Sequence, residues 1–229
     1  MRERGDLDCA HEPFMYDYYV HRQVRVMPHF DVDPDHPQDY AGIRDMLLAR
    51  AEKSPVFFKD MSYYVMPHTM QDEAFSNRLT HAFLIREPMA AILSYFKLDS
   101  DVTRDEIGLE AQWRHFEALQ MAGHHPVVIR SEEVRRDPEG VIAAFWKAID
   151  LPFRAEAFDW SKEMPKDWEQ VGGWHGNVST SQGIKPITQA DLDRQKQQFE
   201  EVAAQHPRMR EELEHHQSFY KKLAAFALC

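Results

Sequence analysis

One arginine stands where a buried strand would end and a helix would begin. Residues 81–86 form a short apolar run that ends at Arg86, and Pro88 suits the first position of a helix. In open α/β sheets, ligands bind beyond the carboxyl ends of the strands. The guanidinium of Arg86 suits phosphate, and Ser94 on the second turn of the next helix could add a hydroxyl donor. Alternatively, Arg86 pairs with an acid at the sheet edge and Ser94 is an ordinary residue of a helix face.

Four apolar runs are expected to form the sheet that positions this arginine. They cover residues 7–10, 55–61, 81–86 and 126–130. Each is nearly continuous rather than alternating, which is typical of strands buried on both faces in a parallel sheet. Helical patterns lie between them. This alternation predicts an α/β fold with three layers, in which helices flank a parallel sheet.

Capping residues predict where the helices begin. Thr103 and Glu106 form a capping box, and the apolar spacing that follows predicts a helix up to Gly123. Thr188, with Asp191 three residues later, caps another helix. The remaining helices are expected over residues 39–52, over 88–98, from 137 onward, and from about 207 to 228.

Length and composition exclude several classes of protein. The chain has 229 residues, 43% of them hydrophobic, and a formal net charge of −11. We expect one domain, 1–229, with a C-terminal helical extension at about 188–229. The acidic balance argues against a nucleic-acid partner. Residues 1–6 contain no apolar stretch of the kind that a signal peptide requires, and no apolar run approaches the roughly 20 residues that span a membrane. A cytoplasmic protein without a membrane partner is therefore expected.

Three segments carry motifs that occur together in one enzyme family. Residues 83–95 contain a strand, Arg-x-Pro, a helix and Ser-x-Tyr, with the Arg and the Ser eight apart. Residues 127–138, with 151–153 further on, contain a strand, an acidic stretch, Asp-Pro, a helix and Leu-Pro-Phe. Residues 174–183 look like a late cofactor loop. Together they resemble a bacterial branch of the sulfotransferases that use 3′-phosphoadenosine-5′-phosphosulfate.

The resemblance implies a fold, a reaction and a set of residues. The fold would be the P-loop kinase-like α/β sheet of sulfotransferases. The reaction would transfer a sulfuryl group from 3′-phosphoadenosine-5′-phosphosulfate to a hydroxyl of a small-molecule acceptor, and no metal is expected. In the family, the matched arginine and serine bind the 3′-phosphate, which assigns this role to Arg86 and Ser94. The late loop adds Trp174, Ser181 and Gly183 as residues that bind the cofactor.

Sulfuryl transfer also needs a base for the acceptor hydroxyl. Residues 11–14 fit the same branch, in which a carboxylate or a nearby histidine takes this role. We expect Glu12 first and His11 second, against the alternative that Glu12 is a helix cap or a surface acid. Lys59, at the end of its strand, could stabilise the transferring group or bind substrate. It could equally form a salt bridge with Asp60 or another acid.

One part of the family's site is missing from the sequence. The 5′-phosphosulfate is normally cradled by a glycine- or serine-rich loop after the first strand, and we find no such loop. Residues 2–5 instead resemble the last turn of the helix that would follow it. We expect an N-terminally truncated copy, from a wrongly chosen start codon or a degenerate gene. The alternative is a fold in which another segment fills the central strand position and which lacks activity.

Other functions fit the sequence less well. A kinase-like nucleotide phosphotransferase shares the α/β frame but would also need a phosphate loop and acids that hold Mg²⁺. A non-catalytic pseudo-sulfotransferase that binds the nucleotide or a protein is compatible with the missing loop. The thirteen histidines show no metal-binding spacing, and the adjacent pair His215 and His216 is expected to be solvated. Residues 16–40 and 63–72 are expected to shape a partly apolar acceptor pocket.

Overall fold

The computed structural model describes residues 1–160, 168, 171–174, 181 and 183–228. The chain forms two compact units. Unit 1 comprises Met1–Arg78 with Arg154–Gly183, and unit 2 comprises Leu79–Phe153 with Ile184–Cys229. The expectation of a single domain stays a prediction. Among the described residues, no helix is both long and apolar enough to cross a membrane.

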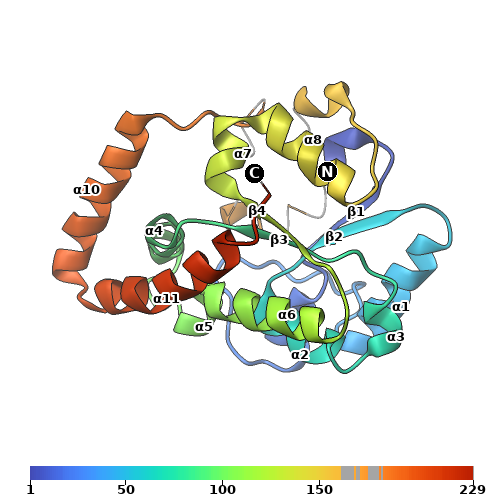
Figure 1. Cartoon of the computed structure of the whole chain (residues 1–229). Helices are drawn as coiled ribbons and strands as arrows, with labels where there is room; N and C mark the ends of the chain where they lie inside the picture. The colour runs from blue at the N-terminus through green and yellow to red at the C-terminus, as the bar shows by residue number, and fades with distance from the viewer. Residues whose placement is uncertain (161–167, 169–170, 175–180, 182, 229) are drawn as a thin grey trace. The chain divides into compact units, whose positions relative to one another are not determined.

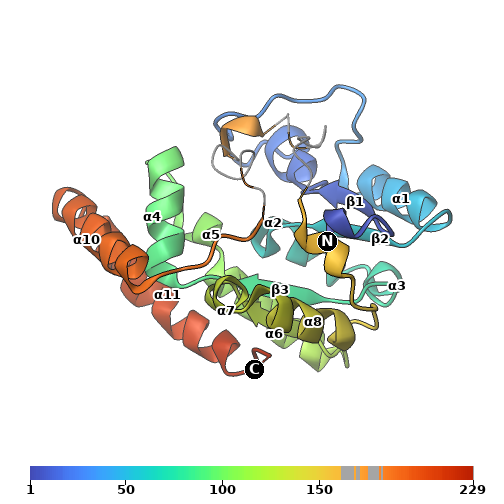
Figure 2. The same cartoon turned by 90° about the horizontal axis from the view of Figure 1, so that it is seen from above.

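Unit 1 is built around one pair of parallel strands. Strand β1 (Asp8–His11) lies beside β2 (Val56–Lys59), with His11 opposite Lys59. Figure 2 shows helix α1 (Tyr40–Ala51) alongside this pair. As predicted, α1 begins after Asp39, whose side chain accepts a hydrogen bond from the backbone N–H of Gly42. The described residues of this unit also form the helices η1 (Arg2–Arg4), the π-helix η2 (Tyr16–His21), α2 (Ser62–Thr69), α3 (Glu73–Ser76), η3 (Ala155–Phe158) and η4 (Gly172–Trp174).

The core of unit 1 forms around Phe14, which is 1% exposed. Its ring contacts those of Tyr40, Phe58 and Phe75, with centroids 5.4 to 6.3 Å apart. These rings come from α1, β2 and α3, so a single aromatic side chain joins these three elements. Offset and edge-on aromatic pairs of this kind add about 0.5–1.5 kcal/mol each beyond the burial of apolar area.

Unit 2 contains the second pair of parallel strands, β3 (Ala82–Ile85) and β4 (Val127–Arg130), with Ile85 opposite Arg130. Figure 1 shows α7 (Ser131–Arg136) and α8 (Pro138–Ala148) above this pair, and α6 (Leu109–Met121) and α11 (Arg208–Ala224) below it. The unit also contains α4 (Pro88–Leu98), α5 (Arg104–Ile107) and α10 (Gln189–Gln205).

The α/β class is confirmed, but the sheet differs in detail from the expectation. The described strands form two separate two-stranded sheets, β1–β2 and β3–β4. The expectation that each strand is buried on both faces is wrong. In β3, exposed and buried residues alternate, and Leu84 keeps 56% of its surface exposed. The apolar composition of β3 therefore fits strand formation without requiring burial of both faces.

The capping signals correctly predict helix starts but miss one interruption. The Thr103–Glu106 capping box is present at the start of α5, and Thr188 with Asp191 caps α10 in the same way. The helix expected to continue from Thr103 to Gly123 is instead broken at Gly108, which has a φ of 85°. Because glycine adopts this left-handed backbone readily, the chain turns there before α6 begins.

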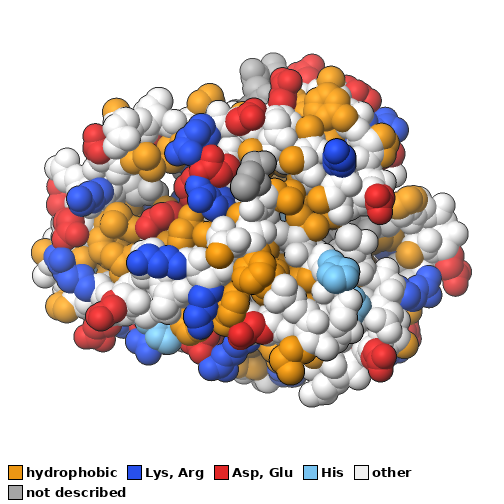
Figure 3. Space-filling view, viewed as in Figure 1, with side chains coloured by type: hydrophobic (Ala, Val, Ile, Leu, Met, Phe, Trp, Pro, Cys, Tyr) orange, Lys and Arg blue, Asp and Glu red, His pale blue; other side chains and the backbone are white. Residues whose placement is uncertain are grey.

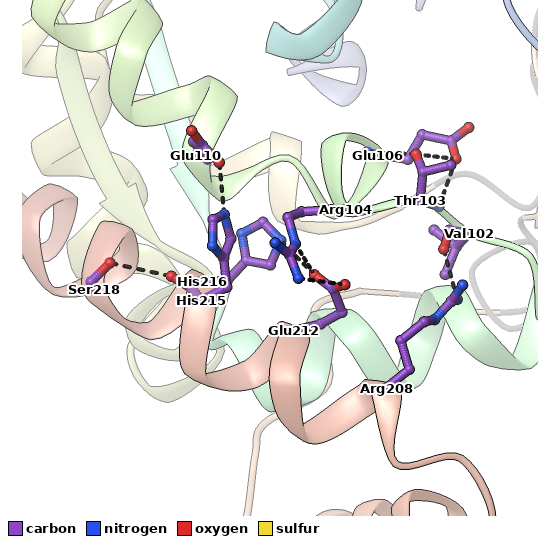
Figure 4. Close-up of polar contacts among 10 residues, drawn as sticks. All are labelled: Val102, Thr103, Arg104, Glu106, Glu110, Arg208, Glu212, His215, His216 and Ser218. Carbon is purple, nitrogen blue, oxygen red and sulfur yellow. Dashed lines mark hydrogen bonds and ion pairs between the residues drawn. The ribbon is translucent and has the colours of Figure 1, made fainter.

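Polar contacts attach α11 to α5 and α6 (Figure 4). The Arg104 guanidinium donates to both carboxylate oxygens of Glu212, at 2.8 and 3.1 Å. His215 contacts Glu110 at 2.7 Å. Next to them, His216 is fully buried, so the expectation of a solvated histidine pair is wrong for this residue. Burial lowers the pKa of His216 to about 4, because the charged ring would lose its hydration.

Unit 2 is expected to lose stability in mild acid through His115. Its side chain packs against Phe83, and burial together with the charge of His81 lowers its pKa to about 3. In the unfolded chain, His115 has its ordinary pKa of about 6.5. Below pH 6.5 the unfolded chain therefore binds a proton at His115 more readily than the folded chain does. Stability falls as the pH drops from about 6.5 towards 3, with a loss of about 2 kcal/mol already present at pH 5.

Urea denaturation at pH 7.5 and pH 5 measures this loss. His115→Phe keeps an aromatic ring but cannot titrate, so it should lose about 2 kcal/mol less stability than the parent between the two pH values. His125→Phe, at an exposed position, is the matched control and should behave like the parent. Equal losses in the parent and in His115→Phe would contradict the assignment.

Candidate functional site

A pocket of about 420 Å³ lies at the carboxyl ends of β3 and β4 in unit 2. Arg86 and Glu87 follow β3 directly, and Ser131 and Glu132 follow β4. Since both strands run parallel, their carboxyl ends meet at one edge of the sheet. The other residues that line the pocket come from α4, α7, α10 and the segment before α10: Met89, Ala90, Arg135, Ile187, Leu192, Gln195 and Lys196.

Arg86 is exposed to solvent in this pocket. Within the described residues it makes neither a hydrogen bond nor an ion pair, so the alternative of a sheet-edge salt bridge is not found there. The surrounding protein lowers the pKa of Arg86 by partial desolvation, and the charge of Glu132 opposes this shift. An arginine remains protonated under such conditions, so the pocket contains an accessible positive charge.

Two further cations that the sequence analysis did not identify line the same pocket. Arg135 comes from α7, and its Nε donates to the backbone carbonyl of Lys185 at 3.1 Å. Lys196 comes from α10 and is exposed. In Figure 3, basic and acidic side chains lie side by side between α4 and α7. Three cations and two acids thus make the pocket locally positive in a chain of net charge −11.

Glu132 links the strand end that carries Arg86 to two helices. Its Oε1 accepts hydrogen bonds from the backbone N–H of Glu87 at 2.8 Å and from the Ser131 hydroxyl at 2.9 Å. Its Oε2 accepts a longer one from the Tyr220 hydroxyl of α11 at 3.4 Å. The charge of Glu132 also helps burial to raise the pKa of Glu87. Glu132 therefore organises the wall of the pocket next to Arg86.

Glu132→Ala is expected to lower the free energy of unfolding by about 1.5–3 kcal/mol, the usual contribution of hydrogen bonds to a charged group. The half-buried N–H of Glu87 would lose its acceptor. Urea denaturation measures the change, with the exposed Glu139→Ala in α8 as the matched control. An unchanged stability would show that water replaces the carboxylate without cost.

The other predicted cofactor residues lie outside this pocket. Ser94 is half-buried on α4 but does not line it. Trp174, Ser181 and Gly183 belong to unit 1, where the Trp174 indole donates to the carbonyl of Pro28 at 2.8 Å. The part of the predicted late loop at 175–180 and 182 lies outside the described residues. The cofactor role of these four residues stays a prediction.

Unit 1 brings the predicted catalytic residues together at the carboxyl end of β1 and β2. The backbone N–H of Glu12 donates to the carbonyl of Lys59 at 2.8 Å, which extends the strand pairing by one residue. The Lys59 ammonium then forms an ion pair with Glu12 Oε1. His11 lies 3.9 Å from the same oxygen, and its ring contacts Trp168. The salt bridge expected as one alternative for Lys59 is thus made with Glu12.

Glu12 has an unusual backbone conformation. Its φ of 44° lies in the left-handed region, which non-glycine residues adopt at a cost of about 1–3 kcal/mol. Its side chain is 14% exposed. Strained residues of this kind cluster at functional sites. The conformation places the carboxylate next to Lys59 and the Tyr64 hydroxyl, which donates to Oε2 at 3.3 Å.

Tyr64 and Asp60 complete this cluster, and the sequence analysis assigned neither a catalytic role. Asp60 follows Lys59 directly, so its position at the end of an expected strand was an available signal. Tyr64 lies on α2, within a segment predicted to shape the acceptor pocket. Among the described residues, no three His, Cys, Asp or Glu side chains gather closely enough to hold a metal ion.

Two curated relatives from Arabidopsis thaliana match part of the chain. Branched-chain-amino-acid aminotransferase-like protein 2 is 24% identical over 146 residues, which cover 62% of this chain and 25% of the relative. Branched-chain-amino-acid aminotransferase-like protein 1 is 29% identical over 109 residues, or 47% of this chain and 20% of the relative. The matched region thus spans a quarter or less of these proteins. No solved structure is significantly similar to the chain.

The family assignment rests on a much longer match. The family described as "Sulfotransferase domain" matches residues 1–197. This region contains β1 to β4 and the cluster of Glu12, Lys59, Asp60 and Tyr64. It also contains the elements that surround Arg86, except for the end of α10 and all of α11. The chain belongs to the sulfotransferase domain family.

Proposed function

We propose that this protein is a sulfotransferase that uses 3′-phosphoadenosine-5′-phosphosulfate as donor and a hydroxyl group of a small molecule as acceptor. The observation that carries the proposal is Arg86, a cation that lines a pocket at the carboxyl end of β3 and has no ion-pair partner among the described residues. Such a cation suits an anionic ligand. The finer fold expectation, one three-layer parallel sheet of the P-loop kinase type, belongs to the same proposal.

The residues around Arg86 fit the 3′-phosphate end of this donor. Arg135 and Lys196 add positive charge, and Met89 and Ile187 add apolar surface. The volume of about 420 Å³ lies within the usual range for pockets that bind small molecules. The donor supplies the activated sulfuryl group, and the nucleotide with its 3′-phosphate is the part that this pocket would hold.

Glu12 would remove the proton of the acceptor hydroxyl. In an in-line transfer, the acceptor oxygen forms a bond to sulfur while the bond from sulfur to the phosphate oxygen breaks. Glu12 Oε would take the hydroxyl proton, and Lys59 would stabilise negative charge on the sulfuryl oxygens. The tyrosine-rich segments next to this cluster, which include Tyr19 and Tyr63, suit a partly apolar hydroxylated acceptor.

Calorimetric titration with adenosine 3′,5′-bisphosphate tests the donor assignment. Adenosine 5′-monophosphate, which lacks the 3′-phosphate, is the matched control ligand and should bind at least about tenfold more weakly, because one charged hydrogen bond contributes about 1.5–3 kcal/mol. Equal affinities would contradict the proposal. Tight binding of the bisphosphate without any turnover of the sulfate donor would instead favour the pseudo-sulfotransferase alternative.

A further inference from the structure

Two carboxyl groups meet at the carboxyl end of the β1–β2 pair. Glu12 is the first residue after β1, and Asp60 is the first after β2. Backbone hydrogen bonds fix both positions. The N–H of Glu12 donates to the Lys59 carbonyl at 2.8 Å, and the N–H of Phe14 donates to Asp60 Oδ1 at 3.2 Å. The parallel register thus places the two acids close together.

The two carboxyl groups have different surroundings. Glu12 is paired with the Lys59 ammonium and accepts a hydrogen bond from Tyr64. Asp60, in contrast, makes no ion pair within the described residues, and its Oδ2 is shielded from solvent and has no hydrogen-bond partner there. An ionised carboxylate with an uncompensated buried oxygen would be costly, whereas a protonated one carries no charge.

Tyr64 lies next to both acids. Its side chain is buried, and its hydroxyl donates to Glu12 Oε2 at 3.3 Å. The same hydroxyl also favours the charged form of Asp60, but this effect is smaller than those of burial and of the Glu12 charge. Tyr64 itself stays neutral, since burial and the charge of Glu12 raise its pKa well above the usual range.

We propose that Asp60 is a neutral carboxylic acid that holds the one proton shared by this carboxyl pair and thereby keeps Glu12 ionised as the base. The proposal rests on the proposed function of Glu12 and makes Asp60 a positioning residue. Two neighbouring carboxyl groups in unlike environments divide the protonation states between them. Lys59 holds the charge on Glu12, and the buried site of Asp60 holds the proton.

The surrounding groups support this division. The groups that face the pair are His11 at the end of β1, the Phe14 N–H after it, Lys59 at the end of β2, and Tyr64 on α2. Burial and the Glu12 charge raise the pKa of Asp60 well above its usual range, and the opposing effects of Tyr64 and Lys59 are smaller. During transfer, the acceptor proton would therefore stop on Glu12, because Asp60 already carries one.

Infrared spectroscopy at pH 7 detects the proton on Asp60 directly. The full chain should show the carbonyl band of a protonated carboxyl group. Asp60→Asn should lose this band, whereas Glu12→Gln and the exposed control Asp31→Asn should retain it. Absence of the band from the parent protein, or its persistence in Asp60→Asn, would overturn the proposal. The band reports the proton on Asp60 and does not require the enzyme to turn over. If Glu12 is not the base, turnover tests fail but the band remains; if Asp60 is ionised, the band itself is absent.

The pH dependence of stability provides a second readout. In the unfolded chain, the Asp60 carboxyl has its ordinary pKa of about 3.8. If Asp60 is protonated in the native state, its native pKa is higher. The parent should then lose stability relative to Asp60→Asn as the pH rises from about 3.8 to that native pKa. If Asp60 is ionised and stabilised instead, Asp60→Asn should lose stability relative to the parent with rising pH. Urea denaturation from about pH 2 to about pH 8 distinguishes the two directions, because a raised native pKa changes stability above about 3.8 and a lowered one mainly below it.

Discussion

Glu12→Gln is expected to lower kcat/KM for sulfuryl transfer by about 10²- to 10⁴-fold, the usual contribution of a positioned general base. Glutamine has nearly the same shape but cannot accept the proton of the acceptor hydroxyl. The substitution leaves Lys59 without its partner, yet the Lys59 side chain is 49% exposed and water can hydrate it. The fold of unit 1 should therefore survive, and the loss should fall on the chemical step.

The measurement is the release of adenosine 3′,5′-bisphosphate from the sulfate donor in the presence of a phenol, a sugar and an aliphatic alcohol as acceptors. Glu52→Gln, at the exposed C-terminal end of α1, is the matched control and should keep the parental rate. The affinity of Glu12→Gln for the bisphosphate should also match that of the parent. A variant that keeps the parental kcat/KM would exclude Glu12 as the base.

Arg86→Ala is expected to weaken the binding of adenosine 3′,5′-bisphosphate by roughly ten- to a hundredfold, which corresponds to the loss of about 1.5–3 kcal/mol from a charged hydrogen bond. Arg135 and Lys196 line the same pocket and keep part of the attraction for the anion. The loss should therefore be partial. No ion pair of Arg86 is broken within the described residues, so the stability of unit 2 should change little.

Titrating two ligands against two proteins separates the 3′-phosphate contact from general effects. Arg86→Ala should lose much less affinity for adenosine 5′-monophosphate than for the bisphosphate, since the monophosphate lacks the group that Arg86 would hold. Arg114→Ala, an exposed arginine on α6, is the matched control and should bind both ligands like the parent. Equal losses for the two ligands would mean that Arg86 does not recognise the 3′-phosphate.

Local signals predicted much of the secondary structure. Pro88 correctly marks the start of α4, and the capping boxes at Thr103 and Thr188 are both present. All four strands lie within or next to the predicted apolar runs. These features depend on a few neighbouring residues, whose backbone groups must be satisfied locally. The capping residues and apolar runs that meet these requirements can be recognised in the sequence.

Features that depend on distant contacts were missed. The burial of His216 requires α11 to pack against α4 and α6, and no neighbouring residue indicates this packing. Exposure of alternate residues along β3 depends on what covers each face of a two-stranded sheet. Helix α2 was not expected, because Pro67 within it weakens its helical pattern.

The same distinction holds for the candidate site. The proximity of Glu12 and Lys59 follows from parallel strands, since residues that leave adjacent strands at one edge are neighbours. The role of Arg86 in a pocket follows from the same rule. Lys196 could not be assigned, because α10 is far from β3 in sequence and reaches the pocket only through tertiary packing. Arg135 follows β4 on α7, where the same strand-end rule was an available signal.

The left-handed backbone of Glu12 has a consequence for how this position would respond to selection. Glycine adopts a φ of 44° without strain, so a library of variants screened for thermal stability alone should enrich glycine at this position. A library screened for turnover should retain the acid. Stability and activity would thus favour different residues at a single codon, as is usual where function requires a strained conformation.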